Sequence, residues 1–153
     1  MINIQHILHP TDFGDNSSEA LKYACSLATQ FSANLHVLNV VQDINVIVGP
    51  LGGVVPMDFN QKQLQIANEK IGEIPDKIIN FRGDITRNVV EGTPFVEIIR
   101  YAKDNVIDLI VMGTHGYSGL EHFLIGSVAE NVVRKAPCPV LTVHPKDYKF
   151  VMP

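Results

Sequence analysis

The chain has 153 residues, of which 46% are hydrophobic and 18% are charged, and its formal net charge is −4. This length and composition fit one domain with a substantial hydrophobic core. The negative balance, with no run of basic residues, argues against nucleic acid as a main partner, because such binding depends on neutralising phosphates. No apolar segment is long enough to span a membrane, and the first residues do not resemble a signal peptide, so we expect no membrane association and a cytoplasmic location.

The chain begins with the pattern of a strand–helix–strand unit. A strand is expected to start near Ile2 and to end at Pro10, where an acidic turn follows. Apolar residues at helical spacing then predict an amphipathic helix, with Asn16 as its N-cap and Glu19 completing a capping box. The second strand is predicted over Leu35–Val41, and the crossover between the two strands should be right-handed.

The middle of the chain contains a loop that is unusually apolar. Residues 44–56 are broken repeatedly by glycine and proline, and a flap packed on the domain is the favoured interpretation. A lid or a partner-binding patch is the alternative, and the sequence does not decide the role of this segment. A helix is expected from Asp58 and a third strand over Ile85–Val90. Thr93 and Pro94 then open another helix, as its cap and its first-turn residue.

The last third supplies two more strands and a helix. The apolar run Val106–Met112 predicts a buried fourth strand, a helix should begin at Ser127, and Val140–Val143 predicts a fifth strand. The alternation of strands and helices indicates an α/β fold, a doubly wound five-stranded parallel sheet with helices on both faces. Residues 1–145 are expected to form a single domain, and residues 146–153 a C-terminal tail.

The loop after the fourth strand carries glycines in a pattern typical of a phosphate site. The spacing is Gly113-x2-Gly116-x9-Gly126-Ser127, which is neither the dinucleotide G-x-G-x-x-G nor the Walker sequence with its lysine. Glycines let the backbone approach a ligand, and the free N–H groups at a helix start attract an anion. The alternative is that the glycines serve only as cap, turn and packing residues. The strand–loop–helix context favours phosphate binding.

This loop, with Met112 before it and Ser-Val-Ala-Glu-Asn-Val after Gly126, resembles the nucleotide motif of the ATP-binding class of universal stress proteins. The resemblance covers nearly the whole chain, because residues 7–12 are similar to that family's opening strand and acidic turn, and residues 135–143 to its closing segment. It implies a Rossmann-like sheet with strand order 3-2-1-4-5. Ligands of such sheets bind where the strand order reverses, so the turn after the first strand and the glycine loop would meet there.

The resemblance also implies which residues bind ATP. Asp12 would contact the base or ribose edge, and Val40 or Val41 would line the adenine pocket. The other ATP-binding residues, beside Asp12 or around the ribose and phosphates, would be Pro10, Thr11, Met112, Gly113, His115, Gly116, Gly126, Ser127 and Val128. A magnesium ion would accompany the nucleotide, near Asp12 or Ser127. Asp12 could instead only cap its turn, one of the two valines could be ordinary core, and His115 could be a solvated loop residue.

The sequence favours binding over catalysis. It shows neither a catalytic arrangement nor metal-ligand spacing among its cysteines and histidines, and the glycine loop has no lysine or arginine to stabilise phosphoryl transfer. An ATP-binding regulatory module of the stress response, acting on an unknown protein partner, is therefore the first hypothesis. A slow ATPase or nucleotidyl-transfer enzyme is the second, and a dimeric interaction protein with incidental nucleotide binding is the third. The family resemblance implies a homodimer, and the apolar strand Val140–Val143, at an expected sheet edge, predicts the contact.

Overall fold

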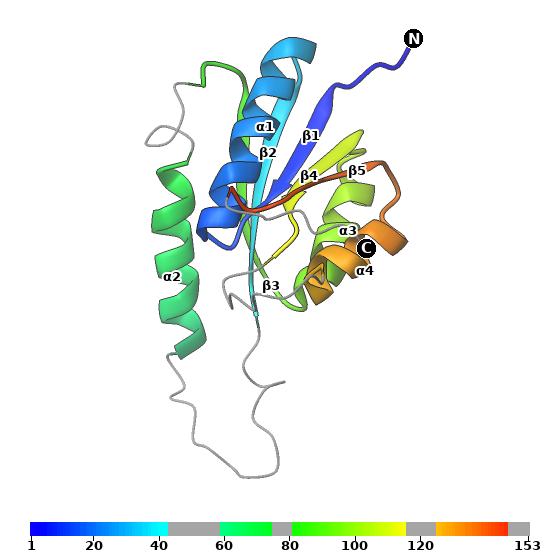
Figure 1. Cartoon of the computed structure of the whole chain (residues 1–153). Helices are drawn as coiled ribbons and strands as arrows, with labels where there is room; N and C mark the ends of the chain where they lie inside the picture. Colours follow the sequence, from blue (N-terminus) through cyan, green and yellow to red (C-terminus); the bar gives the residue numbers. More distant parts are fainter. Residues whose placement is uncertain (43–58, 75–80, 116–124, 147–153) are drawn as a thin grey trace.

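Five parallel strands form a single sheet in the computed structural model (Figure 1), which describes residues 1–42, 59–74, 81–115 and 125–146. The strand order is β3-β2-β1-β4-β5. The strands are β1 (His6–Pro10), β2 (Asn34–Val41), β3 (Ile85–Glu91), β4 (Leu109–Gly113) and β5 (Val140–Val143). The helices are α1 (Asp15–Phe31), α2 (Phe59–Gly72), α3 (Pro94–Asp104) and α4 (Ser127–Lys135).

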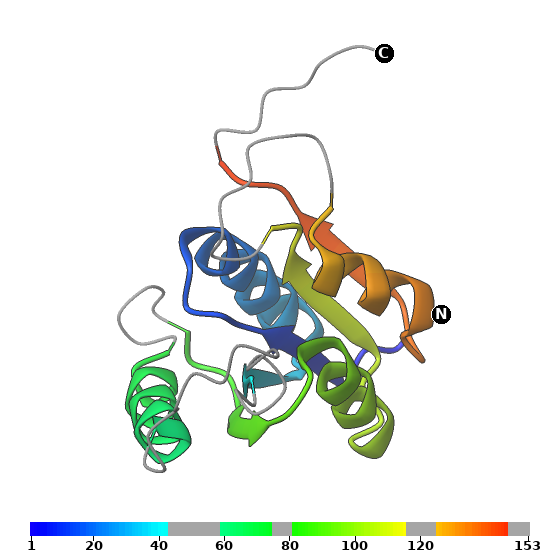
Figure 2. The same cartoon turned by 90° about the horizontal axis from the view of Figure 1, so that it is seen from below.

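The sheet separates two hydrophobic cores. Figure 2 shows α1 and α2 on one face of the sheet, and α3 and α4 on the other. Successive residues of a strand point to opposite faces, so Ile7 packs with α1 and α2 while Leu8 packs with α3 and α4, and both are fully buried. This two-sided burial accounts for the nearly continuous apolar runs in the sequence. The doubly wound, Rossmann-like fold with order 3-2-1-4-5 is thereby confirmed.

Two strands begin later than the sequence predicted. The first strand starts at His6, because Ile2 is 84% exposed and has no sheet to pack against. The fourth strand starts at Leu109 rather than at Val106. The N–H of Val106 still bonds to the carbonyl of Lys103 in α3 at 3.3 Å, and Val106 has a positive φ of 50°. The start of this apolar run therefore forms the turn that follows α3, and the strand begins only after that turn.

The helices begin close to the predicted residues, but two of the predicted N-caps differ from those observed. The first helix has Gly14 as its N-cap and no side-chain cap bond among the described residues, so the expected capping box at Asn16 is wrong. The helix α4 begins where expected, but behind Gly126 and again without a described side-chain cap. The helix α3 begins as predicted, with Thr93 as N-cap and Pro94 in its first position. Asn16 makes a different contact, which belongs to the site below.

Some expectations fall outside the described residues. These are the interpretation of residues 44–56 as a flap, and most of the proposed tail over residues 146–153. Gly116, the second glycine of the motif, also lies in a range that the structure does not describe. Within the described ranges, none of the helices combines the length and the apolar character needed to cross a membrane.

Candidate functional site

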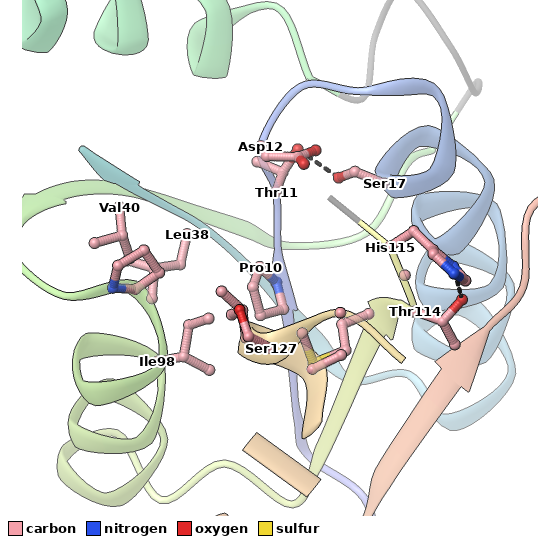
Figure 3. Close-up of a pocket in the computed structure, with 16 residues that line it drawn as sticks. Pro10, Thr11, Asp12, Ser17, Leu38, Val40, Ile98, Thr114, His115 and Ser127 are labelled. Atoms are coloured by element: carbon pink, nitrogen blue, oxygen red, sulfur yellow. Dashed lines mark hydrogen bonds between the residues drawn. The ribbon is translucent and has the colours of Figure 1, made fainter. Parts of the chain in front are cut away.

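A cavity of about 250 Å³ opens beyond the carboxyl ends of β1 and β4 (Figure 3), where the strand order reverses. The predicted site residues that line it are Pro10, Thr11, Asp12, Val40, Met112, Gly113, His115, Gly126, Ser127 and Val128. The structure thus brings the acidic turn and the two described parts of the glycine motif to one place. The position agrees with the general rule that open α/β sheets bind ligands at the switch point.

The apolar wall of the cavity distinguishes the two candidate valines. Val40 lines the cavity together with Leu38, Pro94 and Ile98, whereas Val41 is not among the described lining residues. Residues two apart on a strand share a face, so the alternation of β2 puts Leu38 beside Val40 and turns Val41 away. Sequence reasoning missed Leu38, although this alternation was a signal that could have found it. In Figure 3 these strand residues and Ile98 lie together on one side of the cavity.

The acidic turn after β1 is held by hydrogen bonds on several sides. The N–H of Gly14 donates to Asp12 Oδ1 at 2.9 Å, so the expected alternative role of Asp12 in shaping the turn is real. Thr11 Oγ1 accepts from Ser17 Oγ at 2.8 Å and from the N–H of Phe13 at 3.0 Å. Asn39 Nδ2 donates to the carbonyl of Thr11 at 2.8 Å. Asp12 remains exposed within this rigid frame, so its carboxylate shapes the turn and also faces the cavity.

The other side of the cavity is organised by Thr114, which the sequence analysis did not single out. Its side chain is fully buried, and its Oγ1 lies 2.8 Å from His115 Nδ1 and 3.4 Å from His144 Nδ1. Its backbone N–H donates to the carbonyl of Val143 at 3.0 Å, and its carbonyl accepts from the N–H of Gly126 at 2.7 Å. Thr114 therefore ties the end of β4 to the end of β5 and to the residue that caps α4.

The start of α4 borders the cavity with backbone groups of the kind that attract an anion. Ser127 and Val128 are the first residues of the helix and line the cavity, and the first N–H groups of a helix have no carbonyl partner inside it. The helix dipole adds partial positive charge at the same point. Among the described lining residues, the ionisable side chains are those of Asp12 and His115. The cavity thus offers an apolar wall, a carboxylate and a helix start, which are the elements needed to hold an apolar ring, a hydroxyl-bearing group and an anion.

One more titratable side chain lies just beneath this end of the sheet. His9 is fully buried, and its Nδ1 lies 2.9 Å from the carbonyl of Val111. Burial lowers the pKa of His9 to about 4, against smaller opposing effects of that carbonyl and of Asp12. The imidazole is therefore neutral near pH 7, and its Nε2 has no hydrogen-bond partner in the described part of the chain. His9 belongs to the support of the site rather than to its lining.

Known proteins share this arrangement over nearly the whole chain. Residues 3–144 match the model described as the universal stress protein family. Universal stress protein MJ0531 of Methanocaldococcus jannaschii is 39% identical over 140 residues, which cover 90% of this chain and 80% of that protein. The solved structure of MJ0577, from the same organism, has a TM-score of 0.80 at 30% identity and covers 95% of this chain and 99% of that one.

A further solved structure carries a ligand. It is a universal stress protein in complex with cAMP, with a TM-score of 0.62 at 26% identity, and the match covers 94% of this chain and 99% of that one. The family match includes β1 with its acidic turn, β2, α3, the end of β4 and the start of α4, all of which contribute residues to the cavity. The chain therefore belongs to the universal stress protein family.

Proposed function

We propose that this chain is an ATP-binding regulatory module of the stress response, in which the bound nucleotide sets the conformation and thereby the binding of a protein partner. The observation that carries the proposal is the convergence of the Asp12 turn, an apolar wall and the start of α4 around one cavity at the switch point. The cAMP complex of a related protein supports an adenine nucleotide as the ligand. The proposal keeps the cytoplasmic location expected from the sequence.

The proposed pose follows the chemistry of the walls. The adenine would pack near Val40, with Asp12 at the base or ribose edge. Met112 and Gly113 would face the ribose and the first phosphate, and the start of α4 would take the phosphate chain through backbone N–H groups. In this pose each part of the nucleotide meets a group of matching polarity.

A magnesium ion fits this site as part of the nucleotide rather than as a protein-held metal. Mg²⁺ is usually bound by one or two carboxylates together with phosphates and water. Asp12 is the carboxylate of the described lining, and one of its oxygens already accepts a bond from Gly14. No group of three or more His, Cys, Asp or Glu residues that could hold a metal occurs in the described ranges. When bound, the ion would neutralise phosphate charge, with Asp12 or Ser127 nearby.

Binding is proposed over catalysis because of what surrounds the phosphates. The described lining contains neither lysine nor arginine, the side chains that commonly stabilise a transferring phosphoryl group. Uniform binding of a nucleotide does not by itself accelerate its cleavage. The competing hypothesis of a slow ATPase predicts steady phosphate release that scales with protein concentration and disappears in a Gly126 variant.

The proposal includes a homodimer formed through β5. This strand pairs with β4 on one side and is the last strand of the sheet, so its other edge has no strand partner among the described residues. Leu141 on β5 and Val133 on α4 are both exposed apolar side chains. A dimer would cover this edge. Light scattering of the wild type and of Leu141→Lys tests it: the wild type should be dimeric and the variant monomeric, and a monomeric wild type at micromolar concentration would refute the contact.

The decisive experiment is calorimetric titration of nucleotide-stripped protein with Mg-ATP. The matched variants are Gly126→Asp and Gly126→Asn, because both residues are good N-caps and the φ of −57° at this position is open to any residue. The aspartate places a negative charge where the phosphates would lie, whereas the asparagine has nearly the same shape without the charge. We expect binding by wild type, little by Gly126→Asp and an intermediate affinity for Gly126→Asn. No binding by folded wild-type protein would overturn the proposal.

A further inference from the structure

Asn16 makes a contact that the local sequence does not predict. It lies in the first turn of α1, beside the Asp12 turn. Its Nδ2 nevertheless donates to the carbonyl of His115 at 2.9 Å, a residue 99 positions away in the chain. Ser17 and Asn39 bond to Thr11 within the wall built by β1, β2 and α1. The Asn16 carboxamide instead reaches the residues just after β4, against which α1 packs, where the glycine loop begins.

The same carboxamide explains why the motif begins with a glycine. A Cβ placed on Gly113 would lie 2.7 Å from Asn16 Nδ2, 3.0 Å from its Cγ and 3.2 Å from its backbone oxygen. Such distances are too short for non-bonded carbon contacts. A side chain at this position therefore requires the Asn16 carboxamide to shift, which disturbs its bond to His115. Gly113 and Asn16 are in this sense one structural unit.

Stability does not account for the asparagine. Its Oδ1 is buried and accepts no hydrogen bond in the described part of the chain, which costs free energy. Asparagine is also a poorer helix former than alanine, and here it caps nothing. A residue that is unfavourable locally and yet makes one long-range bond to a binding loop indicates a role in function.

We infer that Asn16 is a positioning residue for the phosphate part of the nucleotide. It sets the carbonyl of His115, and with it the start of the glycine loop, at a fixed place relative to the Asp12 turn. The inference rests on the proposed function, since it concerns the same cavity. It adds that the first turn of α1 is linked to the start of the glycine loop. Loss of this link should weaken contacts to the phosphates, while the base and ribose contacts near Val40 and Asp12 persist.

The test compares ligands with and without phosphates. Titrations of Asn16→Ala with Mg-ATP and with adenosine are set beside the wild type and beside Ser18→Ala, a control in the same turn whose hydroxyl bonds only locally to the Gly14 carbonyl at 3.1 Å. We expect roughly tenfold weaker binding of Mg-ATP by Asn16→Ala, the upper end of what one hydrogen bond contributes, and adenosine affinity within about twofold of wild type. Its unfolding midpoint should be equal to or above that of wild type. A merely structural asparagine predicts lower stability and equal losses for both ligands.

A double-mutant cycle tests the hydrogen bond between Asn16 and His115 independently. Gly113→Ala should push the Asn16 carboxamide away and reproduce the loss of Mg-ATP affinity, and the double variant should be no weaker than Gly113→Ala alone. Additive losses, or an Asn16→Ala variant that binds Mg-ATP as tightly as wild type, would overturn the inference and leave the proposed function standing. Failure of the wild type to bind either ligand would overturn the proposed function, and the inference with it.

Discussion

The two ends of the sheet both carry polar clusters, but they use them differently. Toward the amino ends of β1 and β2, and across to the middle of β3, the hydroxyl of Tyr101 accepts from Asn88 Nδ2 at 2.8 Å and lies 3.0 Å from His36 Nδ1. His36 Nε2 in turn lies 3.1 Å from His6 Nδ1. These side chains satisfy one another. At the carboxyl ends, the carboxylate of Asp12 and the start of α4 border an open cavity. A polar cluster is therefore a candidate binding site where its groups face open space, and a structural network where they face one another.

The largest expected effect on stability comes from His9. This residue lies at the cavity end of the sheet, but it is fully buried and is not among the described residues that line the cavity. Its pKa is about 4 when folded and about 6.5 when unfolded, so the unfolded chain takes up a proton first as the pH falls. Stability should therefore drop by about 3 kcal/mol between pH 6.5 and pH 4. Denaturant unfolding across this range measures the drop. His9→Asn keeps a donor for the Val111 carbonyl and should show a shallower dependence on pH; an unchanged slope would contradict the assignment to His9.

Tyr101→Phe should lower stability without changing nucleotide affinity, which distinguishes the closed polar network from the cavity. Loss of the hydroxyl leaves Asn88 and His36 without their shared partner in a partly buried network, which should cost about 2 kcal/mol of unfolding free energy. Mg-ATP affinity should stay within about twofold of wild type, because Tyr101, Asn88 and His36 are not among the described residues that line the cavity. Chemical unfolding and calorimetry on the same preparation measure both quantities. A large loss of Mg-ATP affinity with an unchanged unfolding free energy would contradict the assignment of Tyr101 to a purely structural network.

Asp12→Asn is the matching change at the cavity end. Asparagine retains an oxygen for the Gly14 N–H, so the turn should persist and unfolding free energy should change by less than about 0.5 kcal/mol. The charge-assisted bond to a ribose or base group would be lost, and Mg-ATP should bind about tenfold more weakly. The opposite pattern, lower stability with unchanged affinity, would assign Asp12 to the turn alone.

The smallest effect concerns Val106, at the amino end of the sheet. This β-branched residue has a φ of 50° and is 74% exposed, so it bears the strain of a left-handed backbone while burying little surface. Val106→Gly should raise the unfolding free energy by about 1 kcal/mol, since glycine favours this position after a helix. Val106→Ala keeps the Cβ and should gain less. Thermal unfolding of both variants measures the gain, and a destabilised glycine variant would show that the side chain is needed.

Much of the site was visible in the sequence because its signals are local. The glycine spacing and the acidic turn are runs of neighbouring residues, and the rule that ligands bind at a switch point placed them together once the strand order was known. Most of the expected residues do line the cavity. Their roles toward a nucleotide remain predictions that the titrations above test.

The sequence by itself determined the order of strands and helices, because alternating burial and helical spacing are properties of adjacent residues. It did not determine contacts that depend on how distant segments compete. Asn16 was expected to cap its own helix, yet the helix begins before it, at Asp15, and its amide donates to the carbonyl of His115. Val106 was expected in a strand, yet the end of α3 holds its backbone. Thr114 gained its importance only because β4, β5 and α4 meet around it. Tertiary structure decided these cases, since the fold determines which hydrogen-bonding groups come close enough to pair.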